Sequence, residues 1–277
     1  MRHRLAFLVL LFLLIPVTAA TGDGGPSPGA RDGYPGVLGA DGVRYVTSYL
    51  EGSSTVQARR GDRVLRSRIF RGYYGIPLVA YDGSTGGLSG DGRTLVLTTL
   101  SRSFSRFPVL DARTLALRRV VTLRGSYAFD ALSPDGSTMY VIQYTSTIDY
   151  TQYRVRAVDL HSGHVLPGAI VDKREPDEKM QGAPMSRVAT RDGGWAYTLY
   201  SRQAQTAFVH ALDTRHRAAV CIDLPFRVDI SSRVRISLVG TQLVVRQTAI
   251  GTLAVIDTRT YRVTPVRKAV APGTPIR

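Results

Sequence analysis

Short runs of alternating apolar and polar residues, each placed behind a tight polar turn, recur along most of the chain. Asp-Gly pairs mark these turns, and runs such as RTLVLTTL and STMYVIQY follow them directly. Such alternation is typical of half-buried β-strands. The pairs recur 44 to 57 residues apart, at 41–42, 91–92, 135–136 and 192–193, and VGTQLVVRQ at 239–247 is a fifth copy with Gly-Thr as its turn.

A second marker lies later in each unit. It reads VLDARTLAL, AVDLHSGHV, ALDTRHRAAV and VIDTRTYRV, with its Asp at positions 111, 159, 213 and 257, and QARRGDRVL at 57–65 takes the same place in the first unit. Each copy indicates a strand, a tight turn and another strand. The two markers alternate in the same order along the chain, and each marker corresponds to a turn between two strands. Each unit is therefore predicted to hold four antiparallel strands.

Repeating four-stranded units of about 40–50 residues predict an all-β fold, a β-propeller whose blades stack around an axis. A β-sandwich is the competing fold, but it does not require a phased repeat. Five full blades fit between residues 36 and 266, and four or six remain as alternatives. The innermost strands are expected near 36–39, 76–80, 127–132, 184–190 and 232–238.

LSPDGSTMYVIQY at 132–144, with YRVRAVDLHSGHVL at 153–166, resembles the YVTN/WD40-like propeller repeat of secreted and surface bacterial proteins. LSGDGRTLVLT at 88–98 and VATRDGGWAYTLY at 188–200 match that pattern less well. The resemblance implies a propeller fold and an extracytoplasmic setting. It does not imply one activity.

The first 20 residues, MRHRLAFLVLLFLLIPVTAA, have the tripartite pattern of a secretory signal peptide. Two arginines precede an apolar run over 5–17, and cleavage near Ala19 or Ala20 fits the small residues there. Retention as a signal-anchor is the alternative. A Gly/Pro-rich linker is expected over 21–35 and a C-terminal tail over 267–277. The protein is therefore expected to be secreted or associated with the cell envelope.

The 277 residues include 36 Lys and Arg against 21 Asp and Glu, a formal net charge of +15, and nearly all of the basic residues are Arg. For an exported protein, the polyanions available to this charge are envelope polymers and lipid head groups rather than nucleic acid. Because the arginines are scattered, the charge is interpreted first as a solvated surface with weak affinity for such anionic surfaces. The single cysteine excludes a disulfide scaffold, and Cys221 is expected to be a buried thiol.

In a propeller, connections from the second to the third strand and from one unit to the next share one side, which we name the loop face. The Asp-Gly turns lie on the opposite side, the turn face, where Asp and Gly satisfy the turn geometry. Arg-Gly-x-Tyr occurs twice on the loop face, at 71–74 and 124–127. Arg and Tyr are typical of binding hot spots. Alternatively, this element closes each blade and its Tyr packs between sheets. The candidate binding residues are Arg71, Tyr73, Tyr74, Arg102, Arg124, Tyr127, Tyr144, Tyr150, Tyr153 and Arg202.

Catalytic patterns are scarce in the sequence. His161 and His164 flank a turn, but no further ligand stands at metal-binding spacing. A carboxylate pair could come only from Asp130, Asp149, Glu175 and Asp177. The insert VDKREPDEKMQGAP at 171–184 is expected to be a solvated loop.

We therefore expect a secreted, noncatalytic propeller that binds a protein or an anionic envelope glycan, as a monomer, with no cofactor, metal or membrane span after signal removal. An extracytoplasmic hydrolase or lactonase that uses channel carboxylates is the alternative. A purely structural envelope protein is a third.

Overall fold

The computed structural model describes residues 29–99, 104–146, 152–176, 180–202, 205–229, 231, 233–266 and 275–276. The expected signal peptide, residues 1–20, lies outside this part of the chain. All regular elements in the described residues are β-strands, so the all-β prediction is confirmed.

The described strands form five antiparallel sheets of three or four strands and two short strand pairs. The first sheet consists of β2 (Val37–Leu38), β3 (Arg44–Leu50), β4 (Ser53–Arg60) and β5 (Arg63–Arg71). The second consists of β7 (Thr94–Val96), β8 (Phe104–Asp111) and β9 (Leu117–Arg124), and the third of β10 (Tyr127–Leu132), β11 (Thr138–Tyr144) and β12 (Tyr153–Asp159).

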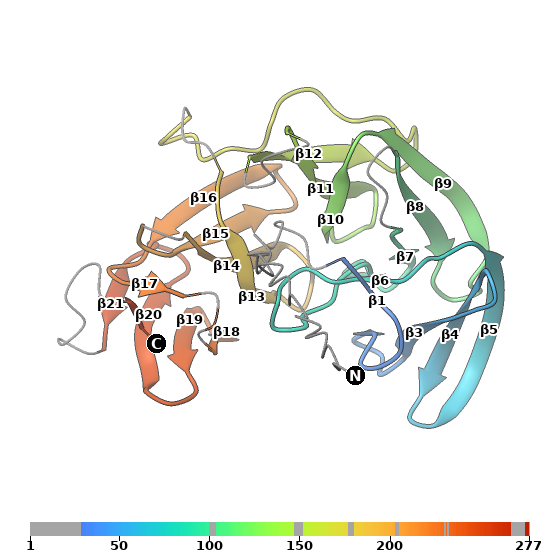
Figure 1. The fold of residues 1–277 in the computed structure, drawn as a ribbon, viewed down its shortest axis with the longest axis horizontal. Helices are drawn as coiled ribbons and strands as arrows, with labels where there is room; N and C mark the ends of the chain where they lie inside the picture. The colour runs from blue at the N-terminus through green and yellow to red at the C-terminus, as the bar shows by residue number, and fades with distance from the viewer. Residues whose placement is uncertain are drawn as a thin grey trace, which may run out of the picture.

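The last two sheets have four strands each. The fourth sheet consists of β13 (Ala183–Ala189), β14 (Trp195–Ser201), β15 (Phe208–Asp213) and β16 (Ala218–Asp223). The fifth consists of β18 (Val234–Val239), β19 (Gln242–Gln247), β20 (Gly251–Asp257) and β21 (Val263–Pro265). Figure 1 shows the sheets fanned around a common centre in chain order. This arrangement is a β-propeller.

The blade count of five stays a prediction, because the second and third sheets contain only three strands each. In the third unit the expected fourth strand is reduced to two isolated bridges, Val158 to Val165 and Val155 to Ile170. Pro167-Gly168 lies between these bridges. Proline lacks the backbone N–H that a continuous strand would donate.

Segments near both ends of the described chain pair with the propeller. β1 (Ala30–Arg31), within the expected linker, pairs antiparallel with β6 (Ile76–Pro77). β22 (Pro275–Ile276), within the expected tail, pairs parallel with β17 (Arg227–Val228). Each segment is only two residues long and acquires its strand geometry from a partner far away in the sequence.

Four clusters of buried apolar side chains fill the spaces between successive sheets. Leu95 and Leu110 of the second sheet pack against Val56 of the first, and Tyr140 of the third packs against the fourth. The Tyr140 hydroxyl also donates a hydrogen bond to the Thr214 carbonyl, 2.9 Å away. Stacking therefore buries sheet faces that a single twisted sheet would leave in water.

The repeated aspartates hold the tight turns. Asp91 Oδ1 accepts hydrogen bonds from the Ser89 hydroxyl and the Arg93 N–H, and Asp135 is held in the same way by Ser133 and Ser137. In the later turns, Asp111 Oδ1 accepts hydrogen bonds from the Arg113 and Thr114 N–H groups. Hydrogen bonds from the Arg118 side chain and the Thr114 backbone lower the pKa of Asp111 to about 2.

Candidate functional site

The loop face of the first two sheets carries an exposed group of aromatic, apolar and basic side chains. Arg71 and Arg124, at the ends of β5 and β9, are exposed, and Tyr73 is 39% exposed. Three further exposed side chains, Tyr49, Leu50 and Phe104, belong to the same ends of these two sheets. We name Tyr49, Leu50, Arg71, Tyr73, Phe104 and Arg124 the loop-face cluster.

Aromatic contacts and strand register hold this cluster. The Tyr49 and Tyr73 rings meet edge to face with their centroids 4.9 Å apart. Phe104 lies directly opposite Arg124 in the β8–β9 pair. The sequence interpretation missed Tyr49 and Leu50, which end an alternating run, and Phe104, which lies two residues after the candidate Arg102.

The two Arg-Gly-x-Tyr elements adopt one hydrogen-bonded arrangement. The Ser54 hydroxyl donates to the Gly72 carbonyl and accepts from the Tyr74 N–H. Ser105 repeats both contacts with Gly125 and Tyr127. The two glycines have φ values of +104° and +110°, where an L side chain is strained. We name this arrangement the serine clasp.

The clasp turns the last side chain of each element inward. Tyr74 packs beside the core between the first two sheets, and Tyr127 packs beside the core between the second and third. Their placement matches the packing alternative for Arg-Gly-x-Tyr, whereas Arg71, Tyr73 and Arg124 stay on the surface.

The remaining predicted residues lie apart from the loop-face cluster. Tyr153 is buried and Tyr144 is half-buried, and both pack in the core between the third and fourth sheets. Arg202 forms an ion pair with Asp223 at 2.7 Å and stacks over the Phe208 ring at 4.2 Å. Arg102 and Tyr150 lie outside the described residues.

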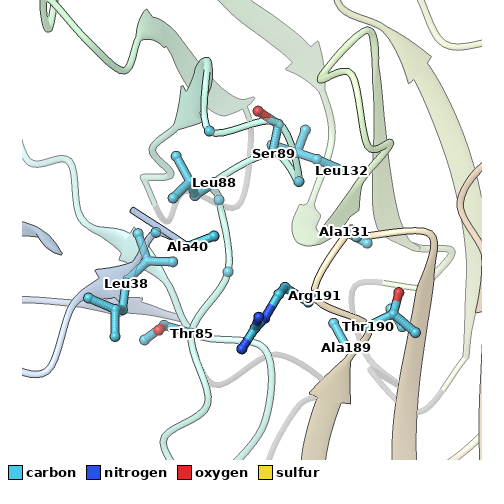
Figure 2. A pocket seen from close by; sticks show the side chains of 18 of the residues that line it. Leu38, Ala40, Thr85, Leu88, Ser89, Ala131, Leu132, Ala189, Thr190 and Arg191 are labelled. Carbon is cyan, nitrogen blue, oxygen red and sulfur yellow. The ribbon is translucent and has the colours of Figure 1, made fainter. Parts of the chain in front are cut away.

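A cavity of about 1010 Å³ opens at the centre of the turn face. Its walls come from the innermost strands β2, β10, β13 and β18 and from residues 85–92. The Asp130 carboxylate and Arg187 guanidinium form an ion pair in its lining, with side chains only 4% and 8% exposed. Figure 2 shows Leu38, Leu88 and Arg191 around this space. None of the eight candidate binding residues that the structure describes lines the cavity.

A row of polar residues crosses the fourth sheet in register. Arg187, Thr198, His210 and Cys221 lie opposite one another on successive strands β13 to β16. His210 Nδ1 lies 3.8 Å from Cys221 Sγ, and burial lowers the pKa of His210 to about 4. The imidazole is therefore neutral at pH 7. Cys221 is half-buried, where a buried thiol was expected.

The residues considered for catalysis are dispersed. Asp130 is held by Arg187, whereas Glu175 and the pair His161 and His164 are exposed. Asp149 and Asp177 lie outside the described residues. Within the described part of the chain, no three His, Cys, Asp or Glu side chains are grouped to hold a metal ion. The insert contains a buried carboxylate, Asp172, which binds Arg174 at 2.6 Å.

No protein-family model matches the chain, and no curated protein matches it in sequence. Similar solved structures include Kuenenia stuttgartiensis hydrazine synthase, with 26% identity, a TM-score of 0.41 and coverage of 64% of this chain and 46% of that one. Apo AztD from Citrobacter koseri has 14% identity, a TM-score of 0.44 and coverage of 83% and 61%. A putative TolB from Agrobacterium tumefaciens has 16% identity, a TM-score of 0.46 and coverage of 86% and 80%.

This chain thus spans less than two thirds of the hydrazine synthase and AztD chains. Its own sheets define the class of protein, an all-β propeller. The more specific resemblance to YVTN/WD40-like repeats stays a prediction. The described residues contain no helix of the length and apolar character that a membrane crossing needs.

Proposed function

We propose that the protein is a noncatalytic binding propeller that recognises an anionic cell-envelope glycan through the loop-face cluster. The exposure of Arg71, Tyr73 and Arg124 beside three further apolar side chains carries this proposal. Guanidinium groups donate paired hydrogen bonds to carboxylates, and rigid aromatic rings supply contact area at low entropic cost. Together they suit a carboxylated sugar, which has both an anionic group and apolar ring faces.

The edge strand β5 favours an extended polymer as the ligand. Its side chains Arg63, Arg66, Arg68 and Arg71 are all exposed, and none forms an ion pair within the described residues. Nine residues of extended strand span roughly 30 Å. By its register with β4, β5 carries Arg63, Arg66 and Arg68 on one face, where they match the repeating charges of a polymer. Arg71 lies on the other face, at the end of the strand that belongs to the cluster.

Export provides the setting in which such a polymer occurs. Residues 1–20 act as the signal peptide in this proposal, and the mature protein meets the envelope as a monomer. The short segments Ala30–Arg31 and Pro275–Ile276 pair with strands of the propeller. The expected linker and the expected tail are therefore each attached to the binding domain by one short strand.

Retention of the full chain on alginate beads tests the function. Alginate is a polymer of carboxylated sugars. The double variant Arg71→Gln/Arg124→Gln should lose about tenfold in affinity, because two charge-assisted contacts are removed. The matched control is Arg259→Gln/Arg262→Gln, which removes two exposed arginines from the turn face and should retain the affinity within twofold.

Poly-L-glutamate beads separate sugar recognition from charge alone. The proposal expects weaker retention on polyglutamate than on alginate at equal carboxylate density. Equal retention on both polymers would contradict sugar recognition and favour an acidic protein as the class of partner. Equal losses of alginate affinity in the two double variants would show that the loop-face cluster is not the binding site.

A further inference from the structure

We infer that the turn-face cavity is a second, separate binding site, which takes an organic monoanion with an apolar body. Its volume of about 1010 Å³ is at the upper end of the range for small-molecule sites. Four innermost strands supply part of its walls and residues 85–92 supply the rest, so the sheets fix much of the shape of the cavity.

The walls provide apolar area for the body of the ligand. Leu38 and Leu88 line one side, and Leu132 and Leu238 line the sides formed by β10 and β18. Leu38 is 54% exposed although it lines a concave space. A bound apolar group would cover this leucine and gain the free energy of removing it from water.

Arg191 provides the positive charge. It follows β13 in the turn that contains Asp192, lines the cavity, and has no ion-pair or hydrogen-bond partner for its guanidinium among the described residues. In Figure 2 its side chain extends into the space towards Thr85. Arg215 lies in a neighbouring turn of the same sheet and instead pairs with Asp192 at 2.6 Å.

The lining contains three arginines and three aspartates, so its formal charges cancel, and Arg93, outside the lining, is the neighbour of one of the aspartates. Arg187 neutralises Asp130, and Arg93 lies 4.0 Å from Asp91. The charges that remain in the lining are Asp41, Arg113 and Arg191. Asp41 Oδ1 accepts a hydrogen bond from the Val43 N–H and is thereby fixed in its turn. The Arg191 guanidinium, which has no partner among the described residues, lies beside apolar walls and is complementary to a monoanion.

The fluorescent probe 8-anilinonaphthalene-1-sulfonate tests this site, because it combines an aromatic body with one sulfonate. Titration of the folded protein should show saturable binding of one probe per chain. Arg191→Gln should weaken that binding about tenfold, because it removes the charge-assisted contact. Arg215→Gln is the matched control on the same face and should leave the affinity unchanged.

Two further measurements separate charge recognition from a change of fold. N-phenyl-1-naphthylamine, the same aromatic body without the sulfonate, should bind wild type and Arg191→Gln equally. Ala189→Trp places a large ring on an exposed lining position and should block both probes. Equal sulfonate binding in wild type, Arg191→Gln and Ala189→Trp would overturn the site.

The two sites can fail independently. Arg191→Gln should leave alginate retention unchanged, and Arg71→Gln/Arg124→Gln should leave sulfonate binding unchanged. Loss of both activities in either variant would show one shared surface and contradict the separate cavity site.

Discussion

Burial keeps the His210 side chain neutral, and this makes the free energy of unfolding depend on pH. Loss of hydration lowers its pKa from 6.5 to about 4, although the nearby Asp130 carboxylate acts in the opposite direction. At pH values between these two pKa values, His210 is largely protonated in the unfolded chain and largely neutral in the folded protein. The free energy of unfolding should therefore decrease by about 3 kcal/mol as the pH falls from 6.5 to 4.

Urea denaturation at a series of pH values measures this dependence. The comparison is His210→Gln, which keeps a polar group of similar size and cannot titrate. The tightly held carboxylates of Asp111 and Asp192, with pKa values of about 2, lose their charge below this pH range. A wild-type profile parallel to that of His210→Gln between pH 6.5 and 4 would contradict the assignment.

At the scale of the elements, the serine clasp explains why Arg-Gly-x-Tyr recurs. Ser105 is 1% exposed and bonds to both the Gly125 carbonyl and the Tyr127 N–H. Ser105→Ala leaves both backbone groups without this partner and should reduce the free energy of unfolding by about 1–3 kcal/mol. The exposed Ser67→Ala on β5 is the control, expected within about 0.5 kcal/mol of wild type. Equal urea midpoints for the two variants would exclude a stabilising clasp.

Local patterns predicted the strands well and the pairing of distant segments poorly. The run YAFDAL was expected as an innermost strand over 127–132 and forms β10 with those bounds. Its mostly apolar run and the Asp135-Gly136 turn after it are both contained in nearby sequence. The pairing of Ala30–Arg31 with Ile76–Pro77 depends instead on tertiary packing, and Gly/Pro-rich sequence gives no periodic signal for it.

For the whole molecule, stacking of the sheets decides which of the candidate side chains reach the surface. Tyr73 lies just after β5 and Tyr153 begins β12, but the first is exposed and the second is buried between the third and fourth sheets. The sequence placed both in loop-face segments, and only the packing of neighbouring blades separates them. The turn-face cavity was not predicted, because its lining is assembled from strands more than 40 residues apart.

The net charge of +15 adds a long-range attraction that the whole molecule shares, and kinetics can separate it from the loop-face contacts. Raising ionic strength from about 0.1 M to 1 M shortens the Debye length from about 10 Å to about 3 Å, so association with immobilised alginate should slow steeply. The variants Arg71→Gln/Arg124→Gln and Arg259→Gln/Arg262→Gln lose the same charge and should associate at equal rates in biolayer interferometry. Only the first should dissociate faster, by about tenfold, because short-range contacts determine dissociation. Faster dissociation of the second variant would mean that alginate contacts the turn face.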